Sequence, residues 1–158
     1  MTKNAELAGA ALGSLDSVGV RDFIVCAGAR NAPLVTTLLS HAASRDWRVR
    51  HHFDERTASF FALGIAKRTV LPVAVFTTSG TAAAELLPAA IEAHYSGVPL
   101  VLVTADRPIR FRGSGAPQAI EQAALLAPYA LCFDIENPAQ LADMSGWQRD
   151  GPLHLNLC

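Results

Sequence analysis

A single carboxylate, Glu55, stands where a predicted strand ends and an apolar helix begins. The run from Val49 to Asp54 precedes it, and an apolar stretch that reaches Lys67 follows. Asp54 can cap this helix, which leaves Glu55 available for chemistry. A carboxyl group enclosed by apolar side chains is protonated more readily, and it can then donate a hydrogen bond to a heteroaromatic nitrogen. The structural alternative is that Glu55 only complements the helix dipole, a contribution of ~0.3–1 kcal/mol.

Two further candidates follow other predicted strands. Gly28 comes after the first strand, where the lack of a side chain allows close backbone approach to a ligand, or simply a tight turn. The run Thr78-Ser79-Gly80-Thr81 begins a helix, and free N–H groups there can hold an anion or the polar edge of a ring. Capping of the helix by Ser79 is compatible with that function. We therefore predict ligand contacts at Gly28 and Thr78.

Arginine dominates the basic residues, since 11 of the 13 are Arg. Its planar guanidinium forms paired hydrogen bonds with a carboxylate or a phosphate, so the bias indicates recognition of such groups. A GC-rich gene would produce the same bias. Arg30 follows the first predicted strand, and Arg107, Arg110 and Arg112 follow the fourth. A solvated basic loop is the alternative explanation for these residues.

Short apolar runs alternate with longer helical patterns along the chain. Strands are expected at Asp22–Cys26, Trp47–Phe53, Val73–Thr77, Leu100–Thr104, Ala130–Ile135 and Leu153–Leu157. Helices are expected at Ala5–Ser17, Ala32–Ser44, Glu55–Arg68, Gly80–Tyr95, Ala119–Leu126 and Pro138–Trp147. This alternation predicts an α/β fold, a three-layer doubly wound parallel sheet of about six strands. Ligands of such sheets bind beyond the carboxyl ends of the strands, so we expect the candidate residues to converge at that edge.

Residues that start and stop helices agree with these boundaries. Asn31, Asp54 and Ser79 can each cap the helix that follows, and Pro33 lies in a first turn, where its missing N–H costs little. Gly97 lies just beyond the fourth expected helix, as a helix stop signal should.

Composition limits the class of protein. With 158 residues, 51% of them apolar, the chain fits one domain over residues 1–158. Its net charge of −1 argues against binding to nucleic acid or anionic membranes. The three cysteines are far apart, and no apolar run reaches the ~18 residues of a membrane span, so we expect a cytoplasmic protein.

Three segments carry a resemblance to a known family: Phe53–Ala66, Val73–Ala82 and Thr104–Pro108. They resemble the N-terminal, pyrimidine-binding domain of thiamine-diphosphate-dependent enzymes, and among these the carboligases of menaquinone biosynthesis. The resemblance implies thiamine diphosphate as cofactor and Glu55 as the catalytic glutamate that bonds N1′ of the aminopyrimidine. It implies cofactor contacts at Gly28, Glu55 and Thr78. It also implies substrate contacts at Arg30, Arg107 and Gln118.

The same resemblance implies a reaction. The matching synthases decarboxylate 2-oxoglutarate and add the resulting succinyl semialdehyde unit to isochorismate. The family's usual Pro-Gly-Ser-Arg-Ser is Ala27-Gly28-Ala29-Arg30-Asn31 here, and its Asn-Gln pair is Pro117-Gln118. Arg110 and Arg112 have no firm counterpart in the family and are left out of the predicted site.

Complete enzymes of this family continue through a central domain and a diphosphate-binding domain, and the resemblance implies a homodimer or homotetramer. The diphosphate-binding domain holds Mg²⁺ or Mn²⁺ through a Gly-Asp-Gly motif, which Asp150-Gly151 cannot be. We therefore expect these two domains to be absent from this chain and the isolated domain to be inactive. The alternatives are a decarboxylase or carboligase of the acetolactate-synthase type and a non-catalytic α/β module that binds a carboxylate ligand.

Overall fold

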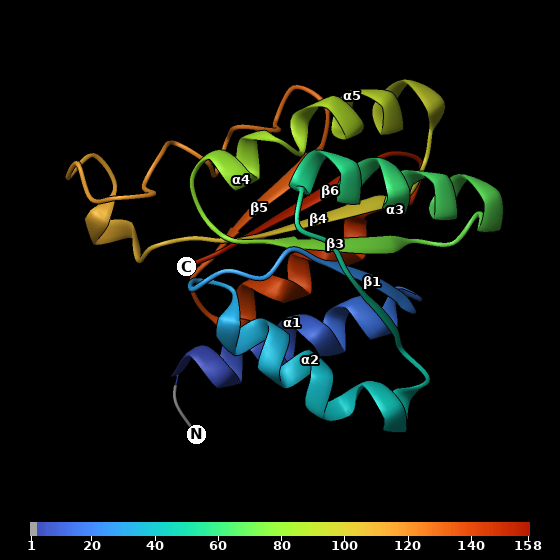
Figure 1. Cartoon of the computed structure of the whole chain (residues 1–158), viewed down its shortest axis with the longest axis horizontal. Coiled ribbons are helices and arrows are strands. Elements are labelled where there is room, and N and C mark those ends of the chain that lie inside the picture. Colours follow the sequence, from blue (N-terminus) through green and yellow to red (C-terminus); the bar gives the residue numbers. More distant parts are fainter. Residues whose placement is uncertain (1–2) are drawn as a thin grey trace.

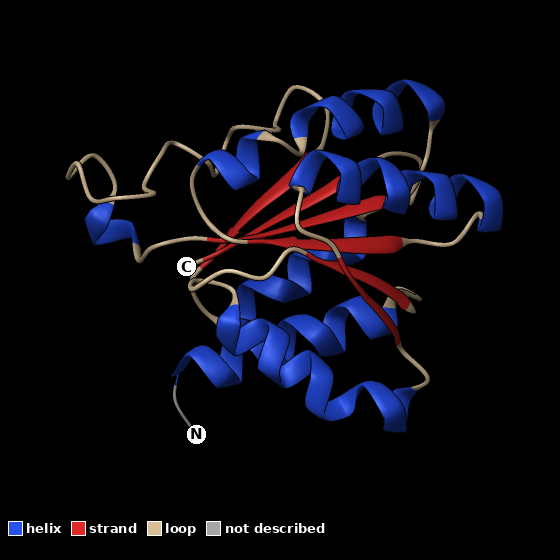
Figure 2. Ribbon diagram, viewed as in Figure 1, coloured by secondary structure: helices blue, strands red, loops and turns tan. Residues whose placement is uncertain are grey.

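A parallel sheet forms the centre of the protein. The computed structural model describes residues 3–158, apart from the side chains of residues 143 and 145. Six strands pair in the order β2-β1-β3-β4-β6-β5, and every pairing is parallel. The strands are β1 (Asp22–Val25), β2 (Arg48–His51), β3 (Val73–Thr77), β4 (Leu100–Ala105), β5 (Leu131–Ile135) and β6 (Leu153–Leu157). Figure 2 shows them as a twisted fan between helices.

Helices cover both faces of the sheet (Figure 1). One layer contains α1 (Lys3–Ser17), α2 (Ala32–Arg45) and the 3₁₀ helix η2 (Pro138–Gly146). The other contains α3 (Glu55–Thr69), α4 (Thr81–Ala84) and α5 (Leu87–Ser96). A short 3₁₀ helix, η1 (Ile109–Phe111), follows β4. The predicted three-layer α/β fold is confirmed.

Alternation along the strands divides the core in two. Phe23 of β1 packs in the cluster beneath α1 and α2, whereas its neighbour Ile24 packs in the cluster beneath α3 and α5. Neighbouring strand residues point to opposite faces, and the central strands β3 and β4 are buried along their whole length. These strands therefore read as continuous apolar runs, while the edge strand β2 is partly exposed.

The strand order reverses at two places, and both lie where the candidate residues are. From β1 the chain first moves outward to β2 and then crosses back to β3 on the other side. Farther along, β6 enters between β4 and β5. Crevices open at such reversals beyond the carboxyl ends of the strands. The first lies between the loops that carry Gly28 and Thr78, and the second lies beside Asp106, whose N–H bonds the Leu157 carbonyl at 2.6 Å.

Most predicted elements are confirmed, and three of the predicted helices are not. Residues 119–126 form turns rather than a helix, because Gln122 directs its buried side chain into tertiary hydrogen bonds. The helix predicted over residues 80–95 is divided into α4 and α5. Pro88 explains the division, since it has no N–H for the Ala84 carbonyl. The segment from Pro138 is a 3₁₀ helix instead of an α-helix.

Two of the three predicted caps are wrong in detail. The Asp54 side chain accepts from the Thr57 N–H at 2.6 Å, which confirms that cap. Asn31 occupies the position before α2 but makes no capping bond. Ser79 does not cap α4, because the N-cap residue is Gly80 and the Ser79 hydroxyl is buried without a partner among the described residues. Gly97 ends α5 in the left-handed conformation, as predicted.

Candidate functional site

The loop after β1 is shaped by Asn31. This fully buried amide accepts from the Gly28 N–H at 2.8 Å and donates to the Cys26 carbonyl at 2.8 Å. Both bonds join side chain to backbone within one turn, so they fix the path that carries Arg30 outward. Asn31 was predicted only as a helix cap, and its role in shaping the loop was missed. Its place in the run after the first strand was the available signal.

Gly28 and Thr78 meet where the strand order first reverses. A Cβ atom at Gly28 would lie 2.6 Å from the Thr78 Cβ, a distance that side chains do not tolerate. The Thr78 hydroxyl oxygen also accepts from the Arg30 N–H at 3.4 Å. The lack of a side chain at Gly28 therefore allows the Thr78 side chain to pack against its backbone. The predicted contacts of both residues with a cofactor stay predictions.

A second group of predicted residues gathers around Gly80. This glycine has φ +83°, and a Cβ atom on it would lie 3.2 Å from the Gln118 Cα. Arg107 donates through Nε to the Pro117 carbonyl at 2.9 Å, and its guanidinium lies 5.7 Å from the Phe111 ring centre. Gln118 and Arg107 are thus neighbours, although eleven positions separate them in the chain. Arg107 is half-buried, while Arg30 is exposed.

Behind Arg107 lies a cluster of charged and amide side chains. Arg112 donates two bonds of 2.7 Å to the Asp134 carboxylate and one of 3.2 Å to Asp106. The Arg112 hydrogen bonds hold the pKa of Asp134 below its ordinary value, against the effect of burial. The Asn156 amide also donates to both carboxylates. Arg112 was left out of the predicted site, and the structure gives it this internal role instead.

Glu55 is the first residue of α3 and stays unpaired. Its side chain is half-buried and makes no hydrogen bond or ion pair with any residue in 3–158 whose side chain is described. The His52 N–H donates to the Val25 carbonyl at 2.9 Å, which places the segment that leads into Glu55 beside the carboxyl end of β1. The apolar enclosure expected for this carboxyl is not supplied by the described residues, because Glu55 stays partly exposed and its neighbours Asp54 and Arg56 are exposed and charged.

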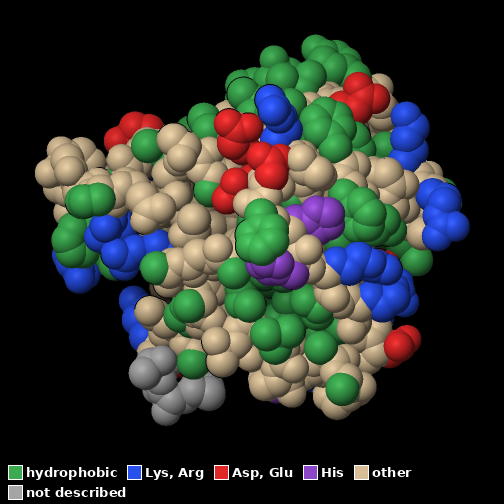
Figure 3. Space-filling model, viewed as in Figure 1, with side chains coloured by type: hydrophobic (Ala, Val, Ile, Leu, Met, Phe, Trp, Pro, Cys, Tyr) green, Lys and Arg blue, Asp and Glu red, His purple; other side chains and the backbone are tan. Residues whose placement is uncertain are grey.

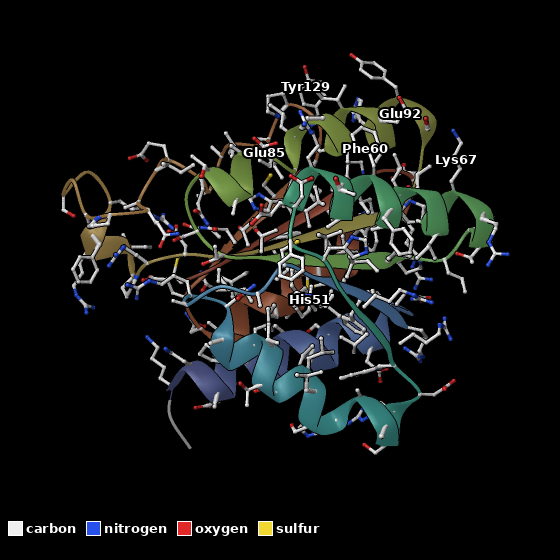
Figure 4. All side chains as sticks on the ribbon, in the orientation of Figure 1. His51, Phe60, Lys67, Glu85, Glu92 and Tyr129 are labelled. Atoms are coloured by element: carbon white, nitrogen blue, oxygen red, sulfur yellow. The ribbon has the colours of Figure 1, made fainter. Side chains whose placement is uncertain are left out.

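Exposed aromatic rings surround the start of α3. Phe53 is 93% exposed and Phe60 is 44% exposed, which is rare for rings of this size. The His51 and Phe53 rings lie 4.9 Å apart, as do those of His52 and Phe61. Figure 3 shows hydrophobic side chains beside histidine and acidic side chains on this face, and Figure 4 shows where His51 and Phe60 lie.

A cavity of about 310 Å³ lies on the other face of the sheet from α3, between α1, α2 and the loop after β4. Lys3, Arg30 and Arg110 contribute positive charge to its lining, and Glu136 and Asp106 contribute negative charge. Arg107 is not among the lining residues, so the cavity does not unite the two arginines predicted for substrate. Arg110 lines this cavity together with Arg30, an arrangement that the sequence did not indicate.

Two other features are absent from the described part of the chain. Three or more His, Cys, Asp and Glu residues nowhere gather as they would around a metal ion. Over the same residues, the helices are all too short or too polar to cross a membrane.

Comparison with known proteins assigns the chain to a family. The family model described as "Thiamine pyrophosphate enzyme, N-terminal TPP binding domain" matches residues 6–125. A protein of Akkermansia muciniphila named 2-succinyl-5-enolpyruvyl-6-hydroxy-3-cyclohexene-1-carboxylate synthase is 54% identical over 142 residues, covering 89% of this chain. The protein of the same name from Bdellovibrio bacteriovorus is 50% identical over 157 residues, covering 98% of this chain. The matched parts are 26% and 29% of those proteins, so the chain spans little more than a quarter of each.

The family match includes the loops after β1 and β3, the start of α3 and the loop that carries Arg107. Glu55 and the contacts of Gly28 with Thr78 and of Gly80 with Gln118 all lie within it. This chain belongs to the thiamine pyrophosphate enzymes, as their N-terminal TPP-binding domain.

Proposed function

We propose that this chain is the pyrimidine-binding part of a 2-succinyl-5-enolpyruvyl-6-hydroxy-3-cyclohexene-1-carboxylate synthase. In this reaction 2-oxoglutarate loses CO₂ and the remaining four-carbon unit is added to isochorismate, on the route to menaquinone. The observation that carries the proposal is the identity of 50–54% to proteins of that name over 89–98% of the chain.

Glu55 fits the role of the residue that contacts the aminopyrimidine ring. A carboxyl that is half-buried, close to the carboxyl end of β1 and unpaired among the described residues can exchange a proton with a ring nitrogen. Thiamine diphosphate, when bound, supplies the carbon nucleophile of the reaction. Gly28 and Thr78 form the adjoining wall at the first crevice, where they orient the ring. Glu55 would hold a proton at N1′.

Arg30, Arg107 and Gln118 fit the role of substrate ligands. Both proposed substrates carry two carboxylates, and guanidinium groups bind carboxylates through paired hydrogen bonds. Arg107 Nε donates to the Pro117 carbonyl. This bond holds the guanidinium in place and leaves its two terminal nitrogens available for a carboxylate. Gln118 packs against Gly80 beside it, so its amide can bond the same ligand.

The remaining parts of the enzyme belong to the proposal as well. The relatives are about four times as long as the matched region, which leaves room for a central domain and a diphosphate-binding domain that holds Mg²⁺ or Mn²⁺. We place the protein in the cytoplasm, because Cys26, Cys132 and Cys158 are free thiols.

We further propose that the enzyme is a homodimer or homotetramer in which a second copy covers the aromatic face defined by Phe53, Phe60 and Phe61. These rings are 93%, 44% and 42% exposed, and such a patch commonly marks an interface. A cover there would also enclose Glu55, which begins the same helix.

Activity of the full-length protein tests the function. With thiamine diphosphate and Mg²⁺, we expect it to release CO₂ from 2-oxoglutarate and to consume isochorismate. Turnover of pyruvate in place of 2-oxoglutarate would instead identify an acetolactate-synthase type of enzyme. Binding of a carboxylate ligand without any turnover would identify a non-catalytic module.

A further inference from the structure

Two turns at the substrate side of the sheet are joined through the interior by hydrogen bonds. One turn contains Gly80, which packs on Gln118, and the other contains Arg107. The Gly80 N–H donates to Gln122 Oε1 at 3.1 Å, and Gln122 Nε2 donates to Asn156 Oδ1 at 2.7 Å. Asn156 Nδ2 donates to Asp106 Oδ2 at 3.1 Å, and Asp106 Oδ1 accepts from the Arg107 N–H at 2.7 Å. Three side chains therefore connect the backbones of the two turns.

The Asn156 amide is saturated, which fixes the direction of this chain of bonds. Its oxygen accepts from Thr104 at 2.8 Å as well as from Gln122, and its nitrogen donates to Asp134 at 2.8 Å as well as to Asp106. An amide offers two acceptor positions and two donors, and all four are used. A flipped amide would set its N–H groups against the Gln122 donor and its oxygen against carboxylates. Gln122 must then present its own oxygen to Gly80.

Burial makes the connection stiff. Gln122, Asn156 and Thr104 are fully buried, and Asp106 is 7% exposed. In such surroundings water cannot replace a lost partner, so a displaced member leaves its neighbours unsatisfied. If the turn with Gly80 moves, the hydrogen bonds that hold the turn with Arg107 are strained as well, and the reverse also holds.

We infer that Gln122 is a positioning residue for substrate binding: it fixes the turn that supports Gln118 relative to the turn that carries Arg107. Gln122 itself is fully buried and acts only through these two residues. The inference rests on the proposed function for the identity of the ligand, and on the hydrogen bonds alone for the coupling of the two turns.

Amide hydrogen exchange of this chain tests the coupling without any substrate. In Gln122→Met, which has a similar volume but no hydrogen-bonding groups, we expect the Gly80 and Arg107 amides to exchange roughly tenfold faster. The amides of Val75 and Val103, in the central strands, should keep their rates. The matched control is Gln140→Met, because Gln140 also holds backbone N–H groups at 2.8 and 3.1 Å but lies in η2. Acceleration at Gly80 without any at Arg107 would overturn the coupling.

Kinetics of the full-length protein test the consequence for substrate. In Gln122→Met we expect kcat/KM for at least one of the two substrates to fall roughly tenfold, while exchange of the C2 proton of thiamine diphosphate changes less than about twofold. Gln140→Met should alter neither. Unchanged substrate kinetics, or equal loss of both activities, would overturn the positioning role. If Gln122→Met does not fold, Thr104→Val removes one donor to Asn156, together with the hydroxyl that bonds His154 Nε2, with little change of shape, and the same measurements decide. A parent protein without carboligase activity would refute the proposed function, while the exchange rates would still decide the coupling.

Discussion

The two ends of the candidate site differ in how completely this chain builds them. Behind Arg107, Gln122 and Asn156 are fully buried and hydrogen-bonded to their neighbours. At the start of α3, Glu55 is half-buried and unpaired among the described residues, and Phe53 beside it is 93% exposed. The end proposed to bind substrate is therefore preorganised within the chain, whereas Glu55 is left partly open, as the proposed cover by a second copy requires.

The difference has a physical basis in the cost of burying polar groups. A buried amide or carboxylate without partners costs on the order of 1–3 kcal/mol, so a chain can bury such groups only where its own strands and loops supply partners. Asn156 of β6 and Arg112 of the loop after β4 do so for Asp106 and Asp134. A carboxyl that bonds a cofactor, the role we propose for Glu55, has to keep its bonding positions open, and Glu55 has no partner among the described residues.

The largest effect is expected at Glu55. In the full-length enzyme, Glu55→Gln should slow exchange of the C2 proton of thiamine diphosphate by about 10²–10⁴-fold, because an amide cannot exchange a proton with the ring nitrogen. Proton NMR of the bound cofactor measures this rate. Asp54→Asn, which keeps a capping oxygen, is the control. A near-normal rate in Glu55→Gln would remove Glu55 from the site.

Arg112 should matter for folding rather than for chemistry. Arg112→Met leaves Asp106 and Asp134 without their guanidinium, and we expect the free energy of unfolding to fall by about 2–4 kcal/mol. This lies near the lower end for buried pairs because the Asp134 side chain is 31% exposed. Urea unfolding of this chain measures the change. Arg110→Met, whose guanidinium only lies over Phe111, should change stability by less than about 0.5 kcal/mol.

The arginines at the substrate end should distinguish a fixed guanidinium from a mobile one. Arg107→Lys loses both the bond to the Pro117 carbonyl and the proposed paired contact with a substrate carboxylate, at a cost of about 1.5–3 kcal/mol. Arg30→Lys should cost less, since the exposed Arg30 side chain is not held in place. Steady-state kinetics with isochorismate and 2-oxoglutarate varied separately measure both. Changes below about twofold in kcat/KM would show that these arginines do not bind substrate.

Association of copies should depend on the aromatic face of α3. Phe60→Asp should weaken self-association at least tenfold, because burial of a phenylalanine contributes about 1.5–3 kcal/mol. Leu39→Asp is the control, because it changes an apolar residue that is even more exposed, at 59%, on α2 in the other helix layer. Sedimentation over a range of concentrations compares the two variants with the parent. A parent that stays monomeric throughout contradicts the proposed interface.

The smallest effect is a dependence of stability on pH. Asp134 has its pKa lowered from the ordinary value of 3.8, chiefly by the Arg112 hydrogen bonds. Its contribution to stability is therefore complete above pH 3.8 and is lost as the pH falls through the lower folded-state pKa. Asp16 and Asp22 behave similarly, so the informative quantity is the difference between the parent and Arg112→Met. We expect the free energy of unfolding of Arg112→Met, measured from urea unfolding curves, to change less than that of the parent as the pH falls below 3.8.

Sequence patterns predicted the elements whose form depends on nearest neighbours. The strands β3 and β6 have the predicted bounds, and α3 begins at Glu55, because apolar periodicity and the Asp54 cap are local signals. The turn over residues 119–126 could not be predicted in this way. Its conformation depends on Gln122 bonding Gly80 and Asn156, which are 42 and 34 positions away in the chain.

The sequence by itself determined the α/β fold, the family and the loops that carry Glu55, Gly28, Thr78 and Arg107. Tertiary structure alone decided that Ser79 does not cap α4, that Gly28 packs on Thr78, and that a buried amide chain links Gly80 to Arg107. The physical reason is range. Helix caps and strand periodicity are set within a few residues, whereas the partners of a buried polar group are chosen only when distant strands come together.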